Sequence, residues 1–85
     1  MNRQKIIDDI LQFIGQESPE LVGEIEPDSD LFELKVMDSF RILTLVLHIE
    51  DKIGLILSHE DLTEENFRSL DSIANLALRY MESDK

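Results

Sequence analysis

The most apolar part of the chain runs from Ser39 to Ile53, where hydrophobic residues recur at the spacing of a helix. At about 100° per residue, these positions divide into two stripes. The broad stripe consists of Ile42, Leu45, Val46, Ile49 and Ile53, and the narrow stripe consists of Phe40, Leu43 and Leu47. Because a helix of a globular domain needs only one apolar stripe to dock on its core, the narrow stripe predicts contact with a neighbouring helix, a ligand or a partner.

The remaining face of this helix is polar and is expected to face solvent; it holds Arg41, Thr44, His48, Asp51 and Lys52. For Leu43 and Leu47 the simpler alternative is ordinary core contact with a short third helix. A charged substitution at Leu47 separates the two, because it should spare folding only if the side chain is not part of the core.

Two other segments show the helical period. Residues 3–16 have a docking stripe of Ile6, Ile10, Phe13 and Ile14, with Asp8, Asp9 and Gln12 toward water. Residues 70–82 have a stripe of Leu70, Ile73, Ala74, Leu76, Ala77, Tyr80 and Met81, and Ser69 can cap them. A short helix within 59–67 can be capped by Ser58, and Gly54 can end the preceding helix. The predicted fold is therefore all-α, a small bundle of three main helices, about 3–16, 39–53 and 70–82, and one short helix.

The residues from Glu17 to Met37 show no sustained period and contain Pro19, Gly23 and Pro27, so we expect a long loop with apolar anchors. Asp28-Ser29-Asp30 resembles the start of a calcium-binding loop. Such a loop needs glycine at its sixth position and glutamate at its twelfth, but this chain has Glu33 and Ser39 there. We therefore expect no metal site in the chain.

The size and charge of the chain disfavour several classes of function. Its 85 residues predict a single domain, 1–85, with a small core, which disfavours an autonomous enzyme. A net charge of −11 disfavours nucleic acid and favours partners with basic patches. The chain has no cysteine, so any thiol chemistry must come from a prosthetic group. It shows neither a signal pattern nor an apolar run that could span a membrane, and we expect a cytoplasmic monomer.

Ser39 is the main candidate for covalent chemistry, because it follows Asp38 and opens the most apolar helix. It could cap that helix or lie in its first turn, where backbone N–H groups and the helix dipole favour a phosphate ester. Asp38-Ser39-Phe40 is an Asp-Ser-apolar triplet, and Asp71-Ser72-Ile73 is a second one, so the triplet alone is not diagnostic. The context differs, because Ser72 lies inside a helix that Ser69 can cap, whereas Ser39 ends a long loop.

Five short motifs occur together in this chain: Leu31-Phe32, Met37-Asp38-Ser39-Phe40, Ile53-Gly54-Leu55-Ile56-Leu57, Glu60-Asp61-Leu62 and Glu65-Asn66-Phe67-Arg68-Ser69-Leu70-Asp71-Ser72-Ile73-Ala74. In their order and spacing the chain resembles the phosphopantetheine-binding carrier proteins, and most closely the stand-alone acyl, peptidyl and D-alanyl carrier proteins. The resemblance covers nearly the whole chain.

The resemblance implies a function for the start of the central helix and for one of its faces. Ser39 would carry a 4′-phosphopantetheine arm, added from coenzyme A by a phosphopantetheinyl transferase, and Asp38 would help that enzyme and its magnesium ion approach. Acyl or aminoacyl groups would travel on the arm as thioesters for lipid, polyketide or peptide biosynthesis. The enzymes that load and transfer them would contact a face with Phe40, Arg41, Leu43 and Leu47.

The chain departs from the family pattern at two places. Lys35 and Val36 stand where the family usually has a glycine, so the loop must turn without a positive φ or under strain. Arg41, Thr44 and His48 stand where many relatives carry acids on the exposed face of the helix. This second departure favours a dedicated set of partners over the general fatty-acid enzymes.

Two other classes of function remain as alternatives. One is an unmodified acidic helical adaptor that binds a basic peptide or helix in its groove. The other is a hydrolase, but neither His48 nor His59 has partners at catalytic spacing and no base stands near Ser39 in the sequence. The chain is therefore expected to be modified by another enzyme and not to catalyse a reaction itself.

Overall fold

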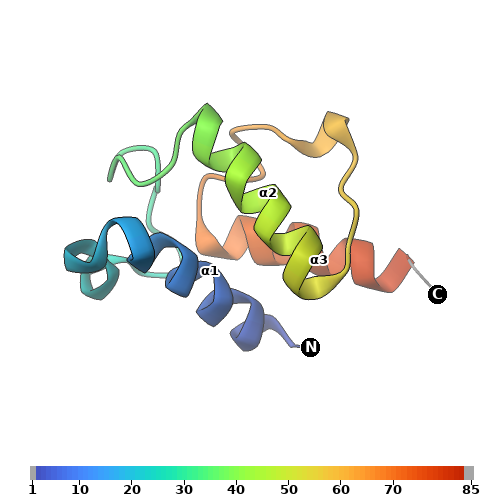
Figure 1. Ribbon diagram of the computed structural model, residues 1–85, viewed down its shortest axis with the longest axis horizontal. Coiled ribbons are helices and arrows are strands. Elements are labelled where there is room, and N and C mark those ends of the chain that lie inside the picture. The colour runs from blue at the N-terminus through green and yellow to red at the C-terminus, as the bar shows by residue number, and fades with distance from the viewer. Residues whose placement is uncertain (1, 84–85) are drawn as a thin grey trace.

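The computed structural model describes residues 2–83, which contain three long helices and two short 3₁₀ helices (Figure 1). The elements in chain order are α1 (Arg3–Glu17), η1 (Pro19–Glu24), α2 (Ser39–Ile53), η2 (His59–Asp61) and α3 (Leu70–Ser83). No strand is present in the described part. The predicted all-α bundle is confirmed, with the three main helices within two residues of their expected bounds and η2 within the segment expected for the short helix.

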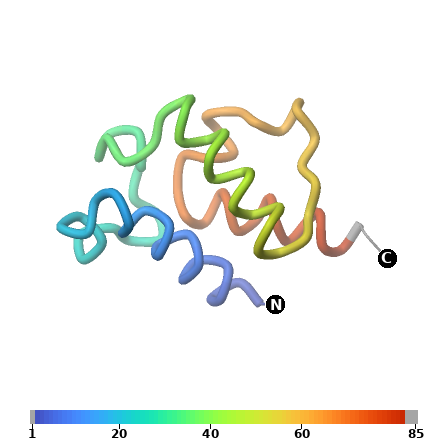
Figure 2. The backbone as a smooth tube through the Cα atoms, viewed as in Figure 1, coloured from blue at the N-terminus to red at the C-terminus, as the bar shows by residue number. Residues whose placement is uncertain are grey.

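The core lies where the three long helices face one another. In Figure 2, α1 and α3 follow the lower part of the molecule, and α2 crosses in front of α3. Each long helix gives its apolar face to one buried cluster; from α1 these are Ile6, Ile7, Ile10 and Ile14, from α2 Ile42, Leu45, Val46 and Ile49, and from α3 Leu70, Ile73, Ala74, Leu76 and Ala77. Each large aliphatic side chain buried in this way contributes roughly 1.5–3 kcal/mol. The predicted broad stripe of α2 is confirmed as the docking face, with Ile53 half-buried at its end.

Several helix ends are formed as their sequence predicts. Ser69 Oγ accepts a hydrogen bond from the Ser72 N–H at 3.1 Å and so satisfies one of the free donors at the start of α3. Gly54 ends α2 in the left-handed conformation, with φ 82°. Ser58 precedes η2, and its hydroxyl accepts a hydrogen bond from the Glu60 N–H.

The segment between α1 and α2 differs from the loop expected there, because Pro19–Glu24 form the 3₁₀ helix η1. The preceding helix α1 ends at Glu17, one residue beyond its predicted end. Gly15 near that end is a packing site: a Cβ added there would lie 3.1 Å from Val22 Cγ2 of η1. A six-residue 3₁₀ helix has too few turns to show an apolar period, which is why the pattern missed it.

The rest of this segment is ordered by buried anchors and by backbone hydrogen bonds to the start of α3. Its buried residues are Ile25, Leu31, Val36 and Met37. The Leu31 N–H donates to the Arg68 carbonyl at 2.7 Å, and the Asp71 N–H donates to the Pro27 carbonyl at 3.0 Å. These bonds hold the long connection against the start of α3, and the connection then leads into α2.

Candidate functional site

Ser39 is the first residue of α2, and its side chain is exposed. Asp38 caps the helix from an extended conformation, and its Oδ1 accepts a hydrogen bond from the Arg41 N–H at 2.8 Å. Of the two positions open to Ser39 from the sequence, the structure therefore selects the first turn. Since Asp38 does the capping, the Ser39 hydroxyl is left available for chemistry.

The turn before Ser39 depends on Lys35, which has φ 62° and is the one described residue other than glycine with a positive φ. A left-handed conformation costs a residue with a side chain about 1–2 kcal/mol. The strain is held by the neighbours, because Val36 and Met37 are buried and the Val36 N–H donates to the Leu31 carbonyl at 3.1 Å. The departure from the family's glycine therefore places Lys35 in a strained turn that directs Asp38 and Ser39 outward.

The narrow apolar stripe of α2 is exposed to solvent. Phe40, Leu43 and Leu47 have exposed fractions of 71%, 52% and 65%. Leu43 and Leu47 are therefore not core residues packed under a short helix. Ile56, in the segment after α2, is 83% exposed and was missed as a surface residue. The missed signal is the side-chain alternation of an extended chain, in which buried Leu55 and Leu57 force the residue between them outward.

The polar face of α2 lies in solvent only in part: Asp51 and Lys52 are exposed as expected, whereas Arg41, Thr44 and His48 are half-buried. Arg41 Nη1 lies 2.6 Å from Glu17 Oε2 of α1. His48 packs its ring on Phe13, with 5.1 Å between ring centroids, and its Nε2 lies 3.6 Å from a carboxylate oxygen of Asp9. This correction also applies to Asp9, which was expected in water; α1 covers this side of α2.

A hollow of about 230 Å³ adjoins Ser39. Its walls are Ile42 and Leu43 of α2, His59 of η2, and Leu62, with Glu64 as a further lining residue. Apolar side chains and polar groups thus meet beside the serine. The sequence did not predict that His59 would share this space. Among residues 2–83 no hydrogen bond joins His59 to Ser39.

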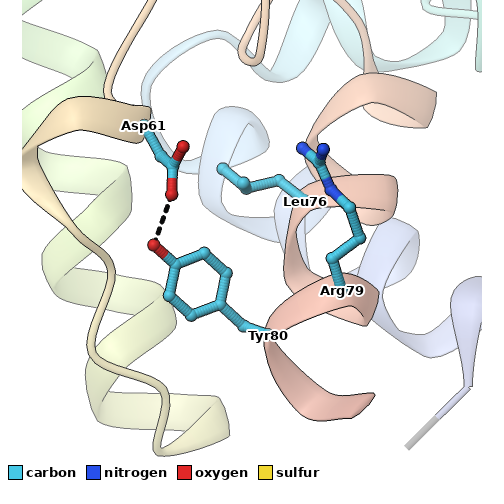
Figure 3. A pocket seen from close by; sticks show the side chains of 4 residues that line it. All are labelled: Asp61, Leu76, Arg79 and Tyr80. Atoms are coloured by element: carbon cyan, nitrogen blue, oxygen red, sulfur yellow. Dashed lines mark hydrogen bonds between the residues drawn. The ribbon is translucent and has the colours of Figure 1, made fainter. Parts of the chain in front are cut away.

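A second hollow of about 220 Å³ lies between η2 and α3. It is lined by Asp61 of η2 and by Leu76, Arg79 and Tyr80 of α3 (Figure 3). The Tyr80 hydroxyl donates a hydrogen bond to the Asp61 carboxylate and accepts one from the Ser58 N–H at 2.8 Å. The hydrogen bond to Asp61 raises the pKa of Tyr80 above its ordinary value. The sequence placed Tyr80 in the docking stripe of α3 but gave no sign of these polar contacts.

Two searches of residues 2–83 gave negative results. No group of three or more His, Asp or Glu side chains is arranged to hold a metal ion. None of the helices there has both the length and the apolar character needed to cross a membrane.

The fold and the site together define a class of protein. An exposed serine at the start of a bundle helix, beside an uncovered apolar stripe and a small hollow, is suited to holding a covalent group where other proteins can reach it. Comparison with known families agrees: the family described as phosphopantetheine attachment site matches residues 6–77. The chain belongs to this family of carrier domains, in which 4′-phosphopantetheine is attached covalently, and its fold is the acyl carrier protein-like helical bundle. No curated protein matches the chain.

Proposed function

We propose that Ser39 is the attachment point and that the protein carries acyl or aminoacyl groups as thioesters on the arm. The observation that carries this proposal is the exposed Ser39 in the first turn of α2, with Asp38 next to it as the capping residue. The bound group supplies the thiol that this cysteine-free chain lacks. The chain itself provides a tether and does not catalyse the transfers.

Attachment needs a transferase, because nothing in the described chain activates the serine. Ser39 Oγ attacks the phosphorus of coenzyme A that bears pantetheine, and the bond from that phosphorus to the nucleotide's phosphate oxygen breaks. The nucleotide leaves, and the hydroxyl proton passes to a base of the transferase. The N-terminal N–H groups and dipole of α2 favour the resulting phosphodiester at this position. Asp38 lies beside the serine, where its carboxylate can assist the enzyme's magnesium ion.

The partner face that we propose consists of Phe40, Leu43 and Leu47, with Arg41 at its edge. Exposure of three large apolar side chains on one helix is a feature of interaction surfaces. Arg41 could reach a partner only by leaving its ion pair with Glu17. The net charge of −11 favours partner enzymes with basic patches around their binding sites.

We propose that the protein is a cytoplasmic carrier for a dedicated lipid, polyketide or peptide biosynthetic pathway. The basis is the pair of departures from the family pattern: the strained Lys35 turn, and the presence of half-buried Arg41, Thr44 and His48 where many relatives carry acids. Partners that recognise an acidic α2 would find no carboxylate in the first two turns of this helix.

The test is the intact mass of the protein after incubation with coenzyme A, magnesium and a broad-specificity transferase. We expect a gain of one phosphopantetheine in the wild type and in Ser72→Ala, and no gain in Ser39→Ala. Ser72 is the matched control because it also stands in an Asp-Ser-apolar triplet, Asp71-Ser72-Ile73, but lies inside α3. A wild-type protein that several transferases leave unmodified would instead support the acidic adaptor.

A further inference from the structure

The connection from α2 to α3 is attached to α3 by the side chain of Tyr80. The tyrosine hydroxyl accepts a hydrogen bond from the Ser58 N–H, just before η2, and donates one to the Asp61 carboxylate, at the end of η2. Figure 3 shows the ring of Tyr80 reaching from α3 to Asp61 across the gap between the two segments. One side chain thus holds both ends of a three-residue helix.

The helix η2 has little else to hold it in place. None of its three residues is buried, and a 3₁₀ helix of this length has weak internal hydrogen bonding. The nearest fully buried residue is Leu57, two residues before η2, and Leu62, directly after η2, is half-buried against the core. Within the connection, Asn66 Nδ2 donates to the Asp61 carbonyl at 2.9 Å, which ties η2 to the following turn but not to a long helix. Segments with so little burial open locally more easily than the rest of a domain.

The position of η2 affects the space beside the attachment serine. Asp61 lines the hollow on the α3 side, whereas His59 and Leu62 line the hollow that adjoins Ser39. One short segment therefore borders both hollows. Any movement of η2 away from Tyr80 changes the wall that faces Ser39.

We propose that Tyr80 and Asp61 are a positioning pair that holds η2 as a wall of the hollow beside Ser39, and that breaking this pair exposes the cargo thioester to solvent. The second half of the proposal rests on the proposed function of Ser39. Neither residue touches the reacting atoms; both act through the position of His59 and Leu62.

The chain offers a direct reporter of the pair, because Tyr80 is its single tyrosine and it has no tryptophan. A carboxylate that accepts a hydrogen bond from a tyrosine hydroxyl quenches the tyrosine's fluorescence. We therefore expect Tyr80 fluorescence to rise in Asp61→Ala. An unchanged intensity would show that the pair does not form in solution and would overturn the proposal.

The position of η2 is tested by amide hydrogen exchange of the full chain. Loss of one hydrogen bond should increase exchange at residues 58–62 by about two- to tenfold. We expect this increase in Tyr80→Phe and Asp61→Ala, a smaller one in Asp61→Asn, whose amide oxygen still accepts the hydrogen bond, and none in α1. The matched control is Asn75→Ala, which removes a different hydrogen bond of α3, that from Arg3 Nη1 at 2.5 Å. A uniform increase over the whole chain in Tyr80→Phe would overturn the proposal.

The effect on cargo is tested by the reaction of hydroxylamine with the loaded protein. Acyl-phosphopantetheine is transferred from acyl-coenzyme A, and hydroxylamine then attacks the thioester carbonyl and releases the thiol. We expect cleavage about two- to tenfold faster in Tyr80→Phe than in the wild type, an intermediate rate in Asp61→Asn, and the wild-type rate in Asn75→Ala. Equal rates in all variants would overturn the positioning role. If no variant can be loaded at Ser39, the proposed function fails, whereas the fluorescence and exchange results still decide whether the pair positions η2.

Discussion

Lys35 shows how the backbone conformation of a single residue sets the direction of Ser39. Its backbone is left-handed, yet its side chain is exposed, so the strain of this conformation is not offset by contacts of the ammonium group. The buried side chains on either side, Leu34 in part and Val36 fully, hold the turn. A residue without a Cβ would adopt the same conformation without strain.

Lys35→Gly should therefore stabilise the protein. Relief of about 1–2 kcal/mol of left-handed strain exceeds the loss of about 0.4–1 kcal/mol from a more flexible unfolded chain. The expected net gain of about 0.5–1 kcal/mol should raise the melting temperature by about 2–8 °C. Lys35→Ala is the control, since it removes the ammonium but keeps the Cβ. An equal gain in both variants would assign the effect to charge and not to the backbone.

Asp30 is a second residue that orders the segment between η1 and α2, and it makes the stability of this segment depend on pH. Its Oδ1 accepts hydrogen bonds from the Glu33 N–H at 3.1 Å and the Phe32 N–H at 3.0 Å, and Arg68 lies 3.3 Å from its Oδ2. These donors, the Glu33 N–H first, hold the pKa of Asp30 below its ordinary value of 3.8. The hydrogen-bonded form is the charged one.

Asp30 should therefore stabilise the fold in full above its unfolded pKa, and this contribution should be lost as the pH falls through its lower folded pKa. Urea unfolding measured from neutral pH down through this range tests the prediction. In Asp30→Asn the fall in unfolding free energy with acidification should be shallower than in the wild type. Parallel curves for the two proteins would show that Asp30 has the same pKa in the folded and unfolded states.

At the scale of elements, α2 has three sides with different surroundings. One faces the core, one is covered by α1 through Arg41 and His48, and one remains exposed as Phe40, Leu43 and Leu47. The same helix also presents Ser39 at its start. A partner that docks on the exposed side is thereby placed next to Ser39, the proposed attachment point.

Leu47→Asp should leave the fold intact and weaken the binding of partner enzymes. The side chain is 65% exposed, so we expect a stability change within about 0.5 kcal/mol. If Leu47 anchors the partner, the substitution should cost about 1–2 kcal/mol of binding, or a roughly five- to thirtyfold fall in the transferase's kcat/KM for this substrate. Leu45→Asp, at a fully buried position of the same helix, is the matched control and should abolish helical circular dichroism. Loss of the dichroism in Leu47→Asp as well would return Leu47 to the core.

At the scale of the whole molecule, the charge is the dominant feature. Nineteen acidic side chains against eight basic ones repel one another in the compact state. The ion pairs of the described residues offset this in part, and they lie on the surface or partly buried, where each is worth little. The folded state is therefore expected to respond to ionic strength.

The melting temperature should rise between about 0.01 M and 1 M salt, over which the Debye length falls from about 30 Å to 3 Å. We expect a rise of several degrees, and a larger one when magnesium replaces sodium at equal ionic strength. A calorimetric or circular-dichroism melt measures it. A flat or falling response would show that repulsion among the carboxylates is already relieved in the folded state.

The sequence by itself was sufficient for the three long helices, for the ends at Gly54 and Ser69, and for the position of Ser39 at the start of α2. The physical reason is that helical periods and caps are local: a residue three or four positions away, or a hydroxyl beside a free N–H, is specified by the chain order alone. The resemblance to the family could also be recognised from the sequence, because it depends only on the order and spacing of short motifs along the chain.

The tertiary structure alone decided which polar residues of α2 face solvent, where the 3₁₀ helix η1 packs, and what holds η2. Arg41 meets Glu17 and Tyr80 meets Asp61 only because distant segments come together, and no local pattern contains those distances. The left-handed turn at Lys35 belongs to the same group. It is unfavourable for that residue by itself, and it persists because the packing of Leu31, Val36 and Met37 over-determines it.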